Sequence, residues 1–160
     1  MRSPERSPVA DVTCSPNAAV AYDFFVRMGL RDYQAAAIVG NLQGESGKQI
    51  NPRLEVMDTN QKMSRGIAMR QPPRWARLLD FAAGRDPWAL ETQLAYLWHE
   101  LRTDSNLGLS ALMSSVTLES ATVVFQDRFE RCSECHTPSR ISNAKAVLYA
   151  CPALRPPPAS

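Results

Sequence analysis

The sequence has no apolar run that approaches the roughly 20 residues which a membrane-spanning helix requires. Its first residues also lack the apolar core of a secretory signal. Charge of one sign is scarce, because 18 basic and 16 acidic residues leave a formal net charge of only +2. Proteins that bind nucleic acids usually carry a far more basic surface. We therefore expect no membrane span and no nucleic-acid partner, and a mild preference for an anionic surface.

The length and composition suit a single domain. A chain of 160 residues with 44% hydrophobic residues is long enough for a real core and too short for two domains. Residues 1–13 combine proline, serine and charge with almost nothing to bury, which predicts a disordered leader. Residues 152–160 are rich in proline and predict a disordered tail. The domain is therefore expected at residues 14–151, as a monomer.

Apolar residues at helical spacing dominate the chain, and capping residues or prolines mark six helix starts. These starts are Ser15, Asp32, Pro72, Asp86, Thr117 and Thr137, and a shorter helix is expected around Leu109 to Ser114. Between the second and third helices, a poorly helical segment bounded by Asn51-Pro52 and Arg65-Gly66 predicts an irregular β-hairpin. The predicted fold class is therefore mainly α, of an α+β kind, with about six to seven helices and a small β-hairpin.

Apolar stripes indicate which helix faces are buried. On the first helix the stripe consists of Val20, Ala21, Phe24, Phe25 and Met28. The helix that follows Asp86-Pro87 carries a stripe about three turns long, so we expect it to be the central buried helix. That stripe consists of Leu90, Leu94, Leu97, Trp98 and Leu101. On the last helix Ile141, Ala144, Lys145 and Leu148 form a shallow amphipathic face.

The most specific signal is an acidic residue at a glycine-flanked helix end. The helix that starts at Asp32 contains Gly40 and Gly44, so another helix can pack closely against it. Gly44 and Gly47 also remove side-chain bulk around Glu45, so a polymer can approach its carboxyl group. Glu45 is therefore a candidate general acid. The alternative is a charge that merely lies exposed at a helix end.

Around these residues the sequence resembles the phage tail lysozyme type domains, within the wider lysozyme and lytic transglycosylase superfamily. The strongest matching pieces are residues 40–47 (GNLQGESG), 66–68 (GIA), 74 and 78–82 (LLDFA). Weaker pieces follow in the same order, at residues 91–94, 99–101 and 125–131. The resemblance spans roughly residues 17–149. One departure is Met69-Arg70, where the family usually has Gln-Trp, so an amide and an aromatic ring are missing from the expected cleft.

The resemblance implies an enzyme that cleaves the β-1,4 bond between N-acetylmuramic acid and N-acetylglucosamine in peptidoglycan. In that role Glu45 is the general acid, and neither a cofactor nor a metal takes part. A hydrolase is favoured, while a lytic transglycosylase and a non-catalytic wall-binding relative stay open as alternatives. We expect the protein to act outside the cytoplasm, as a secreted, periplasmic or virion-associated protein, by an export route that the sequence does not reveal.

A second carboxylate is expected on the hairpin, as in lysozyme, a member of that superfamily. Asp58 lies thirteen positions after Glu45, where the chain can fold back and steady a cationic sugar centre or orient water. Glu55 competes for this role, and a solvated charge is the alternative for either residue. The substrate-binding candidates are Ser46, Asn60, Gly66 and Arg74.

The four cysteines allow three interpretations. Cys132, Cys135 and His136 match the C-x-x-C-H pattern of covalent haem attachment, a rival function from a different class. With Cys14 or Cys151 the same residues supply enough ligands for zinc. Alternatively, disulfides fasten the chain ends in an oxidising compartment. Of the three possible pairings we favour Cys14 with Cys151 and Cys132 with Cys135.

Overall fold

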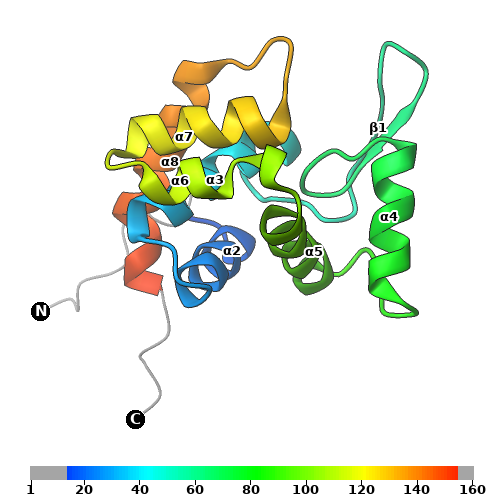
Figure 1. The fold of residues 1–160 in the computed structure, drawn as a ribbon, viewed down its shortest axis with the longest axis horizontal. Coiled ribbons are helices and arrows are strands. Elements are labelled where there is room, and N and C mark those ends of the chain that lie inside the picture. The colour runs from blue at the N-terminus through cyan, green and yellow to red at the C-terminus, as the bar shows by residue number, and fades with distance from the viewer. Residues whose placement is uncertain (1–13, 155–160) are drawn as a thin grey trace, which may run out of the picture.

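The computed structural model describes residues 14–154 and has the predicted, mainly helical fold with one antiparallel sheet of two strands (Figure 1). The α-helices are α2 (Pro16–Arg27), α3 (Asp32–Ser46), α4 (Pro72–Ala82), α5 (Leu90–Thr103), α6 (Leu109–Ser114), α7 (Leu118–Phe125) and α8 (Thr137–Ala150). The strands are β1 (Glu55–Met57) and β2 (Met63–Arg65), and the shorter helical turns are η1 (Ser105–Leu107), η2 (Gln126–Glu130) and η3 (Cys151–Leu154). No helix within residues 14–154 has the length and apolar character needed to cross a membrane.

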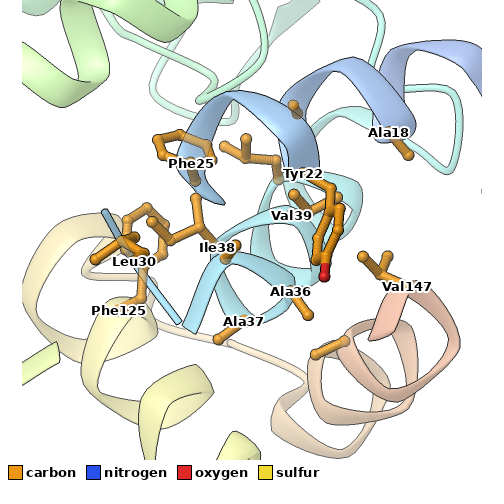
Figure 2. Packing of buried hydrophobic residues seen from close by; sticks show 14 of the residues in the cluster. Ala18, Tyr22, Phe25, Leu30, Ala36, Ala37, Ile38, Val39, Phe125 and Val147 are labelled. Atoms are coloured by element: carbon orange, nitrogen blue, oxygen red, sulfur yellow. The ribbon is translucent and has the colours of Figure 1, made fainter. Parts of the chain in front are cut away.

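Helix α3 forms the centre of the core, with every residue from 34 to 43 buried. Figure 2 shows Phe25 of α2, Phe125 of α7 and Val147 of α8 packed around Ile38 and its neighbours on α3. The expectation that the helix around residues 90–101 is the central one was therefore wrong. Helix α5 buries its leucines in this core and packs Tyr96 against α4 on another side, while α3 is enclosed by α2, α7 and α8 because its small residues let them approach closely.

The closest approach to α3 is made by α8, as the glycines of α3 predict. A Cβ atom added to Gly40 would lie 2.6 Å from the backbone nitrogen of Ala144, which leaves no room for any side chain at position 40. Helix α8 therefore lies directly behind the segment that ends in Glu45. Its buried face includes Arg140 and Asn143, whereas the predicted face residue Lys145 is exposed.

Several local predictions fail at helix ends and edges. The helix predicted to begin at Asp86 begins at Leu90, because the Asp86 carboxylate accepts a hydrogen bond from the Trp88 backbone instead and forms a turn. Val20 and Met28 are exposed although they match the helical spacing, and Tyr22 takes the buried place on α2. Helical spacing defines only a broad apolar face, and the residues at its margins are buried only where another element packs against them.

The predicted hairpin is present and is fastened to α5 by one buried side chain. The strands pair in the register Glu55 with Arg65 and Met57 with Met63. Gln93 of α5 accepts a hydrogen bond from the Ile67 backbone (2.8 Å) and donates to the Pro52 carbonyl (2.8 Å). This side chain thus holds both ends of the hairpin segment. In Figure 1 the hairpin and α4 lie on one side of α5, and the remaining helices lie on the other.

Both favoured disulfide pairings are confirmed. Cys14, before α2, is bonded to Cys151, after α8, and Cys132 is bonded to Cys135 in the loop before α8. Residues 152–154, assigned to the tail by their prolines, continue from α8 as part of η3. The predicted leader (residues 1–13) and the rest of the predicted tail (residues 155–160) lie outside the described residues.

Candidate active site

Glu45 is the second-last residue of α3, at the point where this buried helix reaches the surface. The helix stops at Gly47, whose φ of 89° is easily adopted only by glycine and whose N–H donates to the Gln43 carbonyl. The side chain of Glu45 is 19% exposed, so its carboxyl group is fixed by the helix and still open to a ligand. Glu45 therefore lies where the sequence predicts it, at a helix end bounded by glycines.

Arg140 of α8 holds the carboxyl group of Glu45. Its Nη2 atom donates to Glu45 Oε1 at 2.8 Å, and its side chain is only 5% exposed. The other donors are also used, because Nη1 donates to both oxygens of Asn41 and Nε donates to the Cys135 carbonyl at 2.6 Å. A Cβ atom at Gly44 would lie 3.2 Å from the arginine, so this glycine makes room for the guanidinium beside the acid.

A second carboxyl group in this region is that of Glu130, which lines the same cavity as Arg74. Glu130 ends η2, a π-helical segment in which the Arg131 N–H donates to the Gln126 carbonyl five positions back. Such segments often occur at functional sites. Glu130 Oε1 is buried and has no hydrogen-bond partner among residues 14–154. Burial first, and then the charge of Glu45, hold the pKa of Glu130 well above its usual value, while nearby arginines oppose this.

A buried ion pair fills the region where the family usually has Gln-Trp. Arg70 follows Met69, which has a φ of 49°, and its side chain is 2% exposed. Arg70 Nη2 lies 2.6 Å from Glu100 Oε1, and the guanidinium covers the Tyr96 ring at 4.8 Å. Arg74 extends the cluster, because its guanidinium lies 5.1 Å from the centre of the Phe129 ring. Arg70 therefore stands where the family usually has an aromatic residue, and its side chain is packed in the interior and not solvated.

Asp58 lies at the end of the hairpin, in a polar setting of its own. Its Oδ2 atom accepts hydrogen bonds from the Ser64 hydroxyl and from Gln71 Nε2, the latter at 2.8 Å. The Ser64 bond, and next the Gln71 bond, lower the pKa of Asp58 below its usual value. No hydrogen bond or ion pair joins Asp58 to Glu45 within the described part of the chain. The competing carboxylate, Glu55, is exposed and paired with Arg65 at 2.9 Å.

A comparison with protein families identifies the family to which this chain belongs. The family model described as phage tail lysozyme matches residues 16–150, which include every element from α2 to α8. The chain belongs to the phage tail lysozyme family. Its role is therefore lysozyme-like, with peptidoglycan as the substrate that it cleaves, and an extracytoplasmic or virion location agrees with action on the cell wall. A comparison with curated proteins finds no match.

Within this phage tail lysozyme fold, the predicted substrate-binding residues have different surroundings. Ser46 is buried and its hydroxyl donates to the Leu42 carbonyl, whereas Asn60 is exposed on the hairpin turn. Gly66 has a φ of 80°, and a Cβ atom there would lie 2.5 Å from Gln93 Oε1, so its small size serves the anchoring of the hairpin. Arg74 is partly exposed and lines a cavity of about 170 Å³ together with Glu130.

The C-x-x-C-H segment of this lysozyme domain contacts Arg140, which in turn holds Glu45. The thiols of Cys132 and Cys135 are bonded to each other, so neither is available for the covalent attachment that the haem hypothesis requires. His136 is exposed in the turn before α8. Among residues 14–154, no group of three or more histidine, cysteine, aspartate or glutamate side chains is arranged to hold a metal ion. The Cys135 carbonyl instead accepts the Nε hydrogen bond of Arg140.

Arg140 and Glu130 are not among the site residues predicted from the sequence. Both residues lie far from Glu45 in the chain, and their residue types are common on exposed helix faces. One available signal was Gly44, because a glycine beside an acid at a helix end leaves space for a large side chain from another helix. For Glu130 the signal was weaker, since it lies within the last piece of the resemblance, at residues 125–131.

Proposed function

We propose that this protein cleaves the β-1,4 bond between N-acetylmuramic acid and N-acetylglucosamine by hydrolysis, with Glu45 as the general acid. The observation that carries the proposal is the setting of Glu45 in a phage tail lysozyme domain. Its partly exposed carboxyl group ends a buried helix, and one of its oxygens is held by Arg140. Glycosidic cleavage needs a carboxyl group in a fixed position beside the leaving oxygen.

Arg140 contributes to this chemistry by its charge. After Glu45 has given its proton to the leaving oxygen, a carboxylate remains. A guanidinium is charged at any working pH, and its hydrogen bond to Glu45 Oε1 stabilises that carboxylate. Arg140 is itself fixed by Asn41 and by the Cys135 carbonyl, so it needs no rearrangement when the charge appears. Proton transfer from Glu45 is thereby favoured.

Asp58 is proposed as the second carboxylate of the reaction. Hydrogen bonds from Ser64 and Gln71 lower its pKa, so the group is ionised near neutral pH. An ionised carboxylate on the hairpin can steady the cationic sugar centre or orient the attacking water. This availability favours hydrolysis over lytic transglycosylation, which can proceed without such a residue. Asn60 and Arg74 are proposed to bind the glycan, with Ser46 and Gly66 as the remaining candidates from the sequence.

The products of cleavage test this proposal. Purified protein is incubated with peptidoglycan, and the released muropeptides are analysed by mass spectrometry. Hydrolysis adds one water to each cleaved bond, so we expect products with ordinary reducing ends. Products that carry only anhydro ends would show lytic transglycosylation instead. No release from peptidoglycan, by a folded protein with both disulfides intact, would contradict the enzymatic function itself.

A further inference from the structure

A cavity of about 500 Å³ lies between α4 and α5 and has no part in the proposed reaction. Its aromatic wall consists of Phe81, Tyr96 and His99, whose ring centres lie 5.1 to 6.2 Å apart. Tyr96 is only 6% exposed, and its hydroxyl group has no hydrogen-bond partner among residues 14–154. Most buried polar groups do have a partner, so this hydroxyl group is an unused donor for a ligand in the cavity.

The rim of this cavity carries unpaired charges of both signs. Arg77 and Asp80 are exposed on α4 about one turn apart, and neither forms an ion pair within the described part of the chain. Glu100, on the α5 side, is already used, because it lies 2.6 Å from Arg70. Unpaired charges are common on a protein surface, but these two stand beside an aromatic wall with a buried donor. The cavity is therefore suited to a ligand that carries both a negative and a positive group.

The cavity continues into the smaller one of about 170 Å³. The two share Arg77, Glu100 and Asp104, and the smaller cavity is also lined by Arg74 and Arg131. Because they have these walls in common, we treat them as one hollow along α4. The guanidinium groups at its narrower end are suited to carboxylates.

Helix α4 links this hollow to the proposed second carboxylate. Gln71, the residue before α4, donates from Nε2 to Asp58 Oδ2 at 2.8 Å. From Gln71 to Asp80 the chain rises about 14 Å, at about 1.5 Å a residue. Four residues of extended peptide reach about 14 Å as well. A ligand that extends from Asp58 along this hollow is therefore a linear chain of that length, and a single sugar ring is too short.

We propose that the hollow binds the short peptide that peptidoglycan carries on its N-acetylmuramic acid. The inference deepens the proposed function and rests on it. The glycan is neutral where that peptide is attached, whereas the peptide has free carboxylate groups and, where it is not cross-linked, the ammonium group of a diamino acid. Arg74 and Arg77 receive a carboxylate, because a guanidinium binds one through two parallel hydrogen bonds. Asp80 receives the ammonium group, which also lies against the aromatic wall.

The kinetic test compares soluble glycan strands that carry their peptides with strands from which an amidase has removed them. We expect the wild type to have a KM about tenfold lower for the strands with peptides, as charged hydrogen bonds of ordinary strength would give. The double variant Arg77→Gln with Asp80→Asn should lose this difference and keep its kcat on the stripped strands. The matched control is Glu119→Gln with Lys145→Gln, which removes one charge of each sign from an exposed pair on α7 and α8. It should keep the wild-type preference.

The two proposals fail in different ways in this experiment. Equal wild-type KM values for the two substrates would overturn the peptide site and leave the proposed function intact. Cleavage of neither substrate by the folded protein would contradict the proposed function, and the peptide site would then be decided by binding alone.

The binding measurement uses a synthetic tetrapeptide with free carboxylate and ammonium groups. Its control is the same peptide with these groups amidated and acetylated. In NMR spectra of the full chain, the charged peptide should shift the signals of residues 77–81 and 96–104, and the capped peptide should not. The double variant Arg77→Gln with Asp80→Asn should lose these shifts. Signals that respond to an oligosaccharide of N-acetylglucosamine, and not to the charged peptide, would make the hollow a sugar site and overturn the proposal.

Discussion

Arg140 connects the candidate acid to two other parts of the chain at the scale of single residues. Its four hydrogen bonds reach Glu45, Asn41 and the Cys135 carbonyl, and together they use the planar fork of donors that only arginine provides. A lysine could neutralise Glu45 but could not make these contacts at once. The orientation of Glu45 therefore depends on the shape of the guanidinium as well as on its charge.

The role of the Asp58 carboxylate can be tested by a single substitution. Asp58→Asn keeps the size of the side chain and removes its charge, so we expect turnover to fall on the order of 100-fold if the carboxylate steadies the cationic centre. Glu55→Gln is the control on the same hairpin, because Glu55 is exposed and paired with Arg65. It should change turnover little. Steady-state rates on peptidoglycan compare the two variants, and an unimpaired Asp58→Asn would remove Asp58 from the reaction.

The pH dependence of the wild type adds a check on Asp58. Hydrogen bonds from Ser64 and Gln71 lower its pKa below the usual 3.8, so the carboxylate is lost only as pH falls below that value. Any loss of activity between pH 7 and pH 4 must then come from a group other than Asp58.

At the scale of elements, the two disulfides have separate tasks. Cys14–Cys151 closes nearly the whole domain, with a sequence separation of 137, while Cys132–Cys135 closes a separation of 3. Loop-closure entropy predicts a stabilisation of about 5 kcal/mol for the first and about 2 kcal/mol for the second. The short loop also presents the carbonyl that holds Arg140.

Paired serine variants test this division. The double variant Cys14→Ser with Cys151→Ser should show the larger loss in the free energy of unfolding. The double variant Cys132→Ser with Cys135→Ser should show the larger loss in kcat. The reason is that the short loop orients Arg140 and thereby Glu45. Denaturant unfolding and peptidoglycan turnover measure the two effects. Equal losses of kcat in the two double variants would mean that the short loop has no special part in the site.

The sequence predicted the elements better than their contacts. Capping serines and threonines marked α2 and α7 correctly, since Ser15 and Thr117 accept the expected backbone hydrogen bonds. Gly40 predicted the close approach of α8, because only a helix without side-chain bulk allows it. The partner that α8 brings to Glu45 was not predictable, since Arg140 faces inward only through the packing of two distant helices. The π-helical turn that ends at Glu130 likewise leaves no clear mark in residue spacing.

At the scale of the whole molecule, the fold places Glu45 at the end of a buried helix and Asp58 on a hairpin that is anchored to α5. Helix α3 is enclosed by α2, α7 and α8, so the position of Glu45 is set by the core (Figures 1 and 2). The hairpin that carries Asp58 is fixed to α5 through Gln93, and the buried pair of Arg70 and Glu100 strengthens the same junction. These anchors limit relative movement of the two carboxylates without any direct bond between them.

The measurement that tests the central claim most directly is the rate of peptidoglycan cleavage by Glu45→Gln beside the wild type. Glutamine preserves the size of the side chain and can still face Arg140, so the variant should fold with both disulfides intact. It cannot donate the catalytic proton, and we expect its turnover to fall on the order of 100-fold or more. A folded Glu45→Gln variant that cleaves peptidoglycan at the wild-type rate would contradict the assignment of Glu45 as the general acid.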